Sequence, residues 1–229
     1  MFTDASRDNV LQYAVIKNAY QGIVATEPSG GIKLTLNEVI IDHAYDAGLL
    51  GINTSIRAKN LLVSNCGKNI MLLKGGVYDF THCTVASVSS SYLQHKEPVL
   101  ALTNFLVQNG VTVTNHLDAQ FRNSIFWGET NGIVSDEVVV LKQGNTNFNV
   151  GFHQVLWRVQ NNPANVTETG IINQDPLFDS LNTTERLYSF RLKPGSPAID
   201  KGSASAVSTD LDGRPRPVGL PDLGAYERQ

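Results

Sequence analysis

Residues 38–66 read EVIIDHAYDAGLLGINTSIRAKNLLVSNC and contain one short pattern twice, as Ile41-Asp42-His43-Ala44 and Val63-Ser64-Asn65-Cys66. In each copy an apolar residue is followed by any residue, then by an amide or imidazole side chain, then by a small residue. Four other segments follow the same pattern more loosely: Ile16-Lys17-Asn18-Ala19, Phe80-Thr81-His82-Cys83, Phe121-Arg122-Asn123-Ser124 and Phe152-His153-Gln154-Val155. Units this short cannot bury a core alone, so the repeat predicts a solenoid.

The spacing of the repeats indicates a parallel β-helix. The apolar anchors Ile16, Ile41 and Val63 are 25 and 22 residues apart, which is typical of one coil of such a helix. The later gaps are 17, 41 and 31 residues, so we expect trimmed coils and inserted loops. Nineteen glycines and the absence of helical periodicity agree with an all-β fold. We therefore predict β-helix coils over residues 1–160 and a capping segment packed on the helix over residues 161–229.

The third position of the pattern is expected to form a structural ladder inside the bends of the strands. Stacked amides can hydrogen-bond to one another and to the turn backbone, which satisfies groups that would otherwise be buried unpaired. The predicted ladder consists of Asn18, His43, Asn65, His82, Asn123 and Gln154. A catalytic or metal-binding role for His43 and His82 is the alternative.

Two cysteines, Cys66 and Cys83, follow ladder positions of consecutive repeats. Side chains that project in parallel from stacked strands meet disulfide geometry poorly. We therefore expect two buried free thiols, with a disulfide as the alternative.

Composition limits the partners. The net charge is −3, only 17% of the 229 residues are charged, and no basic stripe is present, so nucleic-acid binding is not expected. No apolar run has the length of a membrane-spanning helix. We predict no cofactor and no metal ligands, with calcium as an open alternative. Asp210-Leu211-Asp212-Gly213 resembles the start of a calcium loop but lacks the later acidic ligands, so we interpret it as a turn.

The C-terminal region is rich in turn-forming residues in a characteristic order. Its elements are Asn173-Gln174-Asp175-Pro176-Leu177-Phe178, Pro194-Gly195-Ser196-Pro197-Ala198-Ile199-Asp200, Thr209-Asp210-Leu211-Asp212-Gly213-Arg214-Pro215 and Pro221-Asp222-Leu223-Gly224-Ala225-Tyr226-Glu227. This set resembles the C-terminal module of secreted bacterial right-handed parallel β-helix proteins of the pectate-lyase-like group, the module found before a variable surface anchor (choice-of-anchor type).

This resemblance implies a right-handed helix, export, and an extracellular or cell-surface location. Residues 1–8 carry no secretory signal, and the first coil begins by Leu11, so we expect a chain that lacks upstream coils. The prolines and apolar residues of the tail are expected to cap the last coil, because proline cannot donate ladder hydrogen bonds.

Strand alternation predicts an outward row that could contact a polysaccharide, since stacked strands repeat every ~4.8 Å. The row offers Asp42, Asp79, Arg122 and His153 as catalytic candidates. The ligand-binding candidates are Arg122, Asp42 and Asp79 of the row, together with Trp127 from a loop after the ladder. Loops could add Asp46, Lys68 and Lys74.

A lyase needs a charge neutraliser and a base, and a hydrolase needs two carboxylates roughly 5 to 10 Å apart, for which Asp42 with Asp46 or Asp79 is the available pair. The leading hypothesis is glycan binding without catalysis. The alternatives are a polysaccharide lyase or glycoside hydrolase, and a structural or adhesive spacer.

Overall fold

The computed structural model describes residues 1–28, 30–130 and 132–229, and every regular element in these residues is a β-strand. The strands are β1 (Asn9–Gln12), β2 (Val15–Lys17), β3 (Gln21–Thr26), β4 (Leu34–Asp42), β5 (Ala47–Ser64), β6 (Lys68–Thr81), β7 (Thr84–Ser87), β8 (Leu100–Thr103), β9 (Phe105–Gln108), β10 (Val111–Thr114), β11 (Leu117–Gly128), β12 (Val138–Leu141), β13 (Phe148–Trp157), β14 (Thr167–Ile172), β15 (Phe178–Asn182) and β16 (Leu187–Leu192). No helix in the described residues is long and apolar enough to cross a membrane.

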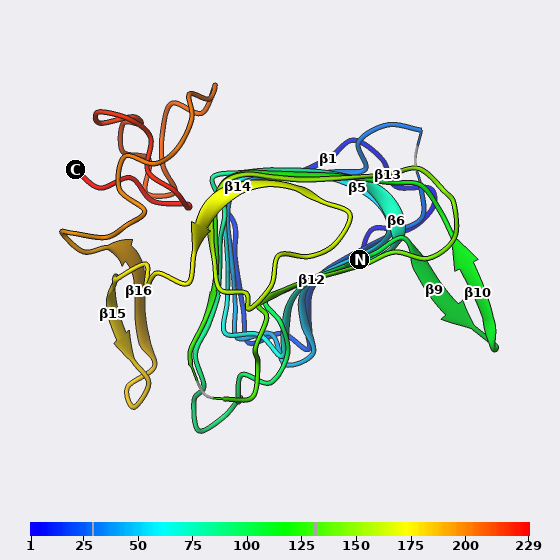
Figure 1. The fold of residues 1–229 in the computed structure, drawn as a ribbon, viewed down its shortest axis with the longest axis horizontal. Helices are drawn as coiled ribbons and strands as arrows, with labels where there is room; N and C mark the ends of the chain where they lie inside the picture. The colour runs from blue at the N-terminus through cyan, green and yellow to red at the C-terminus, as the bar shows by residue number, and fades with distance from the viewer. Residues whose placement is uncertain (29, 131) are drawn as a thin grey trace.

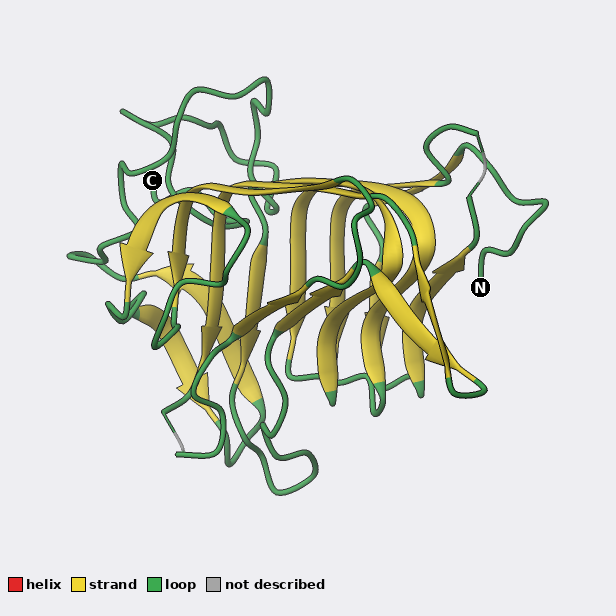
Figure 2. Cartoon of the chain, turned by 45° about the vertical axis from the view of Figure 1, so that its right-hand side comes forward, coloured by secondary structure: helices red, strands yellow, loops and turns green. Residues whose placement is uncertain are grey.

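Successive coils pair with one another in parallel. β1 and β2 pair with β4, β4 with β5, β5 with β6, β6 with β11, β11 with β13, and β13 with β14. The coils superimpose in Figure 1, and Figure 2 shows their strands side by side along the stack. The chain is a right-handed parallel β-helix, the hand expected for parallel crossover connections.

Two columns of apolar side chains fill the interior of the stack, each with one residue per coil. One column holds Leu11, Leu36, Ala58, Phe80, Phe121 and Phe152, and the other holds Ile16, Ile41, Val63, Val85, Phe126 and Trp157. The rings of Phe121 and Phe152 stack with centroids 4.9 Å apart, and Phe152 lies 4.8 Å from the Trp157 ring. Truncating one of these buried rings to alanine costs about 3–5 kcal/mol in comparable cores.

The six sequence repeats occupy two different corners of the coil, five residues apart, instead of the single ladder that was expected. One corner holds Asn18, His43 and Asn65; the other holds Tyr13, Glu38, Asn60, His82, Asn123 and Gln154. The partner of Val63 in the next coil is Val85, 22 residues later, and not Phe80. The 17-residue gap is therefore a full coil minus the five-residue offset, and the prediction of a trimmed coil was wrong.

Both corners match one sequence pattern because both require the left-handed backbone conformation. The φ angles are 56°, 55° and 52° at Asn18, His43 and Asn65, and 54°, 50° and 49° at His82, Asn123 and Gln154. Asparagine and histidine adopt this conformation more readily than most residues.

The side chains at the corners satisfy neighbouring backbone groups more than one another. Asn65 Oδ1 accepts a hydrogen bond from Val88 N at 3.1 Å, and Asn123 Nδ2 donates to the Ser203 carbonyl at 2.8 Å. His82 and Asn123 do contact each other, at 3.1 Å.

The expected loops lie in the coil between Phe80 and Phe121. After β8 the chain forms the antiparallel hairpin β9–β10, which projects to one side in Figure 1 before β11 resumes the helix. Residues 88–98, between β7 and β8, form a second excursion. Insertions of this kind leave the register of the stack intact.

The C-terminal tail packs along the side of the helix and not over its last apolar layer, where it was expected. Figure 1 shows the tail, coloured orange to red, beside the superimposed coils. Outward apolar side chains of successive coils face it: Ile40, Leu62, Ala86, Ile125 and Leu156. The tail contributes Phe178, Phe190, Leu192, Ala198, Leu223 and Tyr226 to the same cluster. Asn60 Nδ2 also donates to Thr209 O at 2.8 Å, and Thr84 Oγ1 accepts from Ala225 N at 2.9 Å.

The two cysteines are buried free thiols, as predicted, but they do not share a position. Cys66 Sγ accepts a hydrogen bond from Ala44 N, whereas Cys83 lies in the column of Leu61 and Ser124. Burial raises the pKa of both thiols to about 12, so neither is a reactive thiolate at neutral pH.

Candidate functional site: a polar outer face

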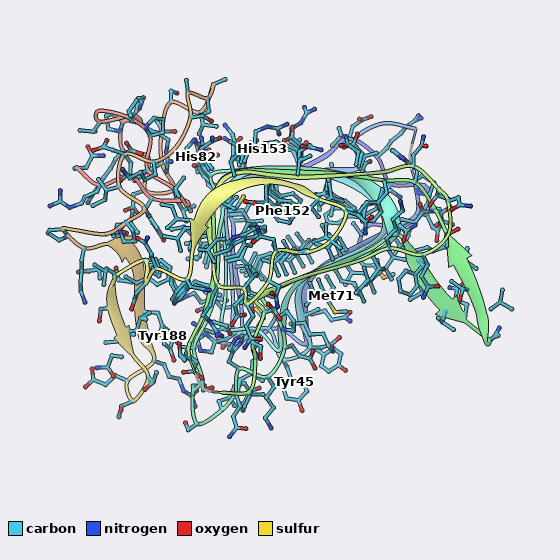
Figure 3. All side chains as sticks on the ribbon, viewed as in Figure 1. Tyr45, Met71, His82, Phe152, His153 and Tyr188 are labelled. Carbon is cyan, nitrogen blue, oxygen red and sulfur yellow. The ribbon has the colours of Figure 1, made fainter. Side chains whose placement is uncertain are left out.

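One outer face of the helix carries polar side chains from successive coils, which are partly or fully exposed. We call it the polar face and define it by Arg57, Asp79, Asp118, Gln120, Arg122, Asn149 and His153. Arg57, Asp79 and Gln120 are register partners, and so are Arg122 and His153. In Figure 3, His153 points outward while its neighbour Phe152 points into the interior, which is the alternation that creates the face.

Asp79 lies between two arginines of the neighbouring coils. Its Oδ1 accepts a hydrogen bond from Arg122 Nη1 at 2.7 Å, and its Oδ2 lies 3.9 Å from Arg57 Nε. The side chains of Arg57, Asp79 and Arg122 are 59%, 43% and 40% exposed, so solvent reaches all three. Two guanidinium groups thus contact the single carboxylate of Asp79, while Asp118 supplies the second carboxylate of the polar face, so the charges of the face as a whole balance.

A second set of hydrogen bonds lies beside this ion pair. Gln120 Oε1 lies 3.1 Å from His153 Nε2, while Gln120 Nε2 and Asn149 Nδ2 donate to Asp118 Oδ1 at 3.3 and 3.1 Å. Gly151 makes this packing possible, because a Cβ there would lie 2.4 Å from Gln120 Oε1 and 2.6 Å from His153 Nε2. The face is therefore an ordered network of donors and acceptors.

The structure brings Asp79, Arg122 and His153 onto one face, as predicted, but it places Asp42 elsewhere. Asp42 pairs with Ser64, in the row that continues to Ala86 and Trp127. This row lies beyond the corner at Asn123, on the side that the tail covers. The prediction of a single outward row was wrong for the same reason as the prediction of a single ladder. Both predictions combined residues that lie next to two different corners of the coil.

Asp42 forms part of the contact with the tail. Its Oδ1 accepts from Ser64 Oγ at 2.9 Å and lies 2.8 Å from His43 Nδ1, and the His43 ring is 5.5 Å from the ring of Tyr188 in the tail. Burial alone would raise the pKa of Asp42. The net pKa is nevertheless lowered, because three neighbours stabilise the charged carboxylate: His43 through its hydrogen bond and charge, Ser64 through its hydrogen bond, and Lys17 through its charge. Asp42 therefore stays ionised and holds the corner together.

Trp127 is partly buried against the apolar cluster of the tail, so it does not lie beside Arg122 as expected. It lines a hollow together with Asp175 and Phe178 of the tail.

The loop candidates Asp46 and Lys68 form an ion pair at 3.1 Å on a third side of the helix. Lys74 lies at yet another bend, with a φ of 62°.

The acidic residues do not gather around a metal position. Across residues 1–28, 30–130 and 132–229, no three or more His, Cys, Asp or Glu side chains lie close enough to hold a metal ion. Asp210 is buried, and its Oδ1 accepts from Asp212 N at 2.9 Å and from Arg214 N at 2.8 Å. The interpretation of Asp210-Leu211-Asp212-Gly213 as a turn is therefore confirmed.

The sequence analysis missed Arg57, Asp118 and Asn149. The signal for Arg57 was present, because it precedes Asp79 by 22 residues, the same interval that separates Ile41 from Val63. Using that interval for every outward position would have placed Arg57 beside Asp79.

Comparison with known proteins supports the fold. No protein-family model matches the chain, and no curated protein matches it. Among solved structures, the crystal structure of pectate lyase Pel9A superimposes with a TM-score of 0.52 at 16% sequence identity, covering 99% of this chain and 61% of that one. The chain thus spans less than two thirds of the length of that lyase. At this level of identity the likeness shows the fold alone: a right-handed parallel β-helix of the kind seen in pectate lyase Pel9A.

Proposed function

We propose that this chain is a carbohydrate-binding β-helix module of an extracellular or cell-surface protein, and that its polar face binds glycans that carry carboxylate groups. The observation that carries the proposal is the arrangement of Arg57 and Arg122 around Asp79. The guanidinium group of Arg57 is 3.9 Å from Asp79 and 59% exposed, so it offers a planar donor group to a ligand carboxylate, which arginine binds in a bidentate manner.

The ion pair of the polar face can yield to a ligand at small cost. Exposed ion pairs contribute only about 0–1 kcal/mol, because solvent screens them and two flexible side chains must be ordered. A uronic acid carboxylate can therefore replace Asp79 as the partner of Arg57 or Arg122. The equatorial hydroxyls of the sugar could then exchange hydrogen bonds with Gln120, Asn149 and His153.

The shape of the polar face suits a polymer. Its side chains repeat along the helix with the strand spacing of ~4.8 Å, so an extended chain laid along the stack meets one set of donors and acceptors per coil. Binding without turnover is favoured over hydrolysis by a pair formed from Asp42 and Asp79, because these two carboxylates lie on different faces. We also propose that the tail precedes a surface anchor in the intact protein.

A glycan array that contains acidic and neutral polysaccharides tests the proposal. We expect acidic glycans to bind, and the double variant Arg57→Ala/Arg122→Ala to bind at least about tenfold more weakly. Arg214→Ala is the matched control, since Arg214 is an exposed arginine of the tail, in the turn at Asp210, and is not one of the polar-face residues. New unsaturated or reducing ends in the bound glycan would instead favour the enzyme, and neither binding nor turnover would favour the spacer.

A further inference from the structure

A groove on a different side of the helix presents exposed tyrosines. Tyr20 and Tyr45 occupy equivalent turns of the first two coils, and their rings stack with centroids 5.9 Å apart at an interplanar angle of 28°. They are 68% and 55% exposed. Tyr92, from the loop between β7 and β8, is 54% exposed and lines the same groove, with the Arg186 guanidinium 5.5 Å from its ring centroid. Figure 3 shows Tyr45 across the coil from His153 of the polar face.

The groove that these rings line has a volume of about 540 Å³, within the 300–1,000 Å³ common for small-molecule sites. The next coil has glycine, Gly67, at the corresponding turn, so no third ring follows Tyr45 there. A Cβ on Gly67 would lie 2.2 Å from the Tyr45 carbonyl oxygen, so the close approach of the two turns excludes any side chain there. The loop with Tyr92, Leu93 and Gln94 forms the opposite wall.

A row of polar side chains runs beside the tyrosines, one from each of three coils. Asp46 Oδ2 accepts from Gln21 Nε2 at 2.8 Å, and Asp46 Oδ1 accepts from Lys68 Nζ at 3.1 Å. The hydrogen bond from Gln21 lowers the pKa of Asp46, slight burial opposes it, and Lys68 adds to it. Asp46 thus remains an ionised acceptor, fixed next to the aromatic rings.

This combination matches the two kinds of surface on a pyranose ring. The faces of a pyranose carry C–H groups that pack on the electron-rich faces of aromatic rings, while its hydroxyls project around the edge and require hydrogen-bond partners. An exposed aromatic patch rimmed by polar groups is the usual mark of an interaction site. The ionised groups that line the groove are balanced, with Asp46 and Glu97 against Lys68 and Lys96, so the lining itself carries no net charge and suits a neutral sugar.

We propose that the groove formed by Tyr20, Tyr45, Gly67 and Tyr92 binds neutral pyranose oligosaccharides. This deepens the proposed function, but it rests on residues that the polar face does not use. The groove runs across consecutive coils, so it takes a short run of sugar units and not a single one. Chains that contain both neutral and acidic sugars could occupy both sites.

The test titrates the whole chain with a panel of neutral hexasaccharides (β-1,4-glucan, β-1,4-mannan and β-1,4-xylan) by isothermal titration calorimetry. We expect at least one of them to bind, and Tyr20→Ala and Tyr45→Ala each to weaken that binding at least about tenfold. Tyr45→Phe should stay within about threefold of the wild type, because the stacking face is kept. Tyr13→Ala is the matched control, since Tyr13 is 75% exposed outside the groove.

The variants separate this inference from the proposed function. Arg57→Ala/Arg122→Ala should leave neutral oligosaccharide binding unchanged, and Tyr45→Ala should leave acidic glycan binding unchanged. Failure of every neutral glycan to bind would overturn the inference, and so would wild-type affinity in Tyr20→Ala and Tyr45→Ala. Loss of acidic glycan binding alone would overturn only the polar-face proposal. Circular dichroism of each variant at the titration temperature excludes unfolding as the cause of lost binding.

Discussion

Acidification should destabilise the contact between the helix and the tail through one buried histidine, His82. This residue is 0% exposed, at the corner of the coil beneath the tail. Its ring lies between Arg216, whose Nη1 contacts Nδ1, and Ser205, whose Oγ is 3.0 Å from Nε2. Burial and the charge of Arg216 lower the pKa of His82 from 6.5 to about 3.

The sign and size of the effect follow from the protons bound in each state. Between pH 6.5 and 3 the unfolded chain binds a proton at His82 that the folded chain does not bind, so the free energy of unfolding falls as the pH falls through this window. One pKa unit corresponds to about 1.36 kcal/mol, which gives a loss of about 2.5 kcal/mol from this residue between pH 7 and pH 4.5.

Urea denaturation at the two pH values measures the loss. His82→Asn is the informative variant, because asparagine tolerates the φ of 54° at this position and does not titrate. The wild type should lose about 2.5 kcal/mol more than His82→Asn between pH 7 and 4.5, while carboxyl groups titrate in both proteins and cancel. Equal losses in the wild type and His82→Asn would refute the reasoning.

Two further predictions concern stability. Asn65→Leu removes the acceptor of Val88 N and a donor to Asp42, so the free energy of unfolding should fall by about 1–3 kcal/mol; an unchanged thermal midpoint would contradict the assigned corner. A chain that ends at Asn161 uncovers the apolar side row of Ile40, Leu62 and Leu156, so size-exclusion chromatography should show aggregation or unfolding; a folded monomer would show that the tail is a separate appendage.

The architecture could be predicted from the sequence because alternation and coil length are local properties. An apolar residue two positions before an asparagine or histidine is typical of a bend in the left-handed conformation, although Tyr13 and Glu38 adopt it too, each with a φ of 52°. The same preference explains why a single ladder was wrongly predicted. The bends at Asn65 and at His82 have the same backbone conformation and favour the same residues, so the local sequence does not distinguish the two corners. Only the pairing of Val63 with Val85, a contact between different coils, assigns the two bends to different corners.

The polarity of the outward residues already indicated that the repeats do not share one face. Ile40, Leu62, Asp79 and Gln120 each stand one residue before the apolar anchor of their repeat, yet the first two are apolar and the last two are polar. The structure assigns the first two to the side that the tail covers and the last two to the polar face. A mixed row of this kind indicates two faces with different surroundings.

The proximity of Asp79 and Arg122 could be predicted from the sequence, because both residues belong to repeats at the same corner of the coil. The tyrosine groove could not, since it depends on how the loop of Tyr92 folds back over the turn of Tyr45.

The central claim, recognition of carboxylate-bearing glycans by Arg57 and Arg122, is tested most directly by titrating the chain with an oligogalacturonide and with its methyl ester. The two ligands differ in charge but have the same sugar backbone. We predict that the free acid binds, that esterification weakens binding at least about tenfold, and that Arg57→Ala/Arg122→Ala removes the difference between the two ligands. Equal affinity of the wild type for the acid and the ester, or a preference for the acid that survives in the double variant, would contradict the account.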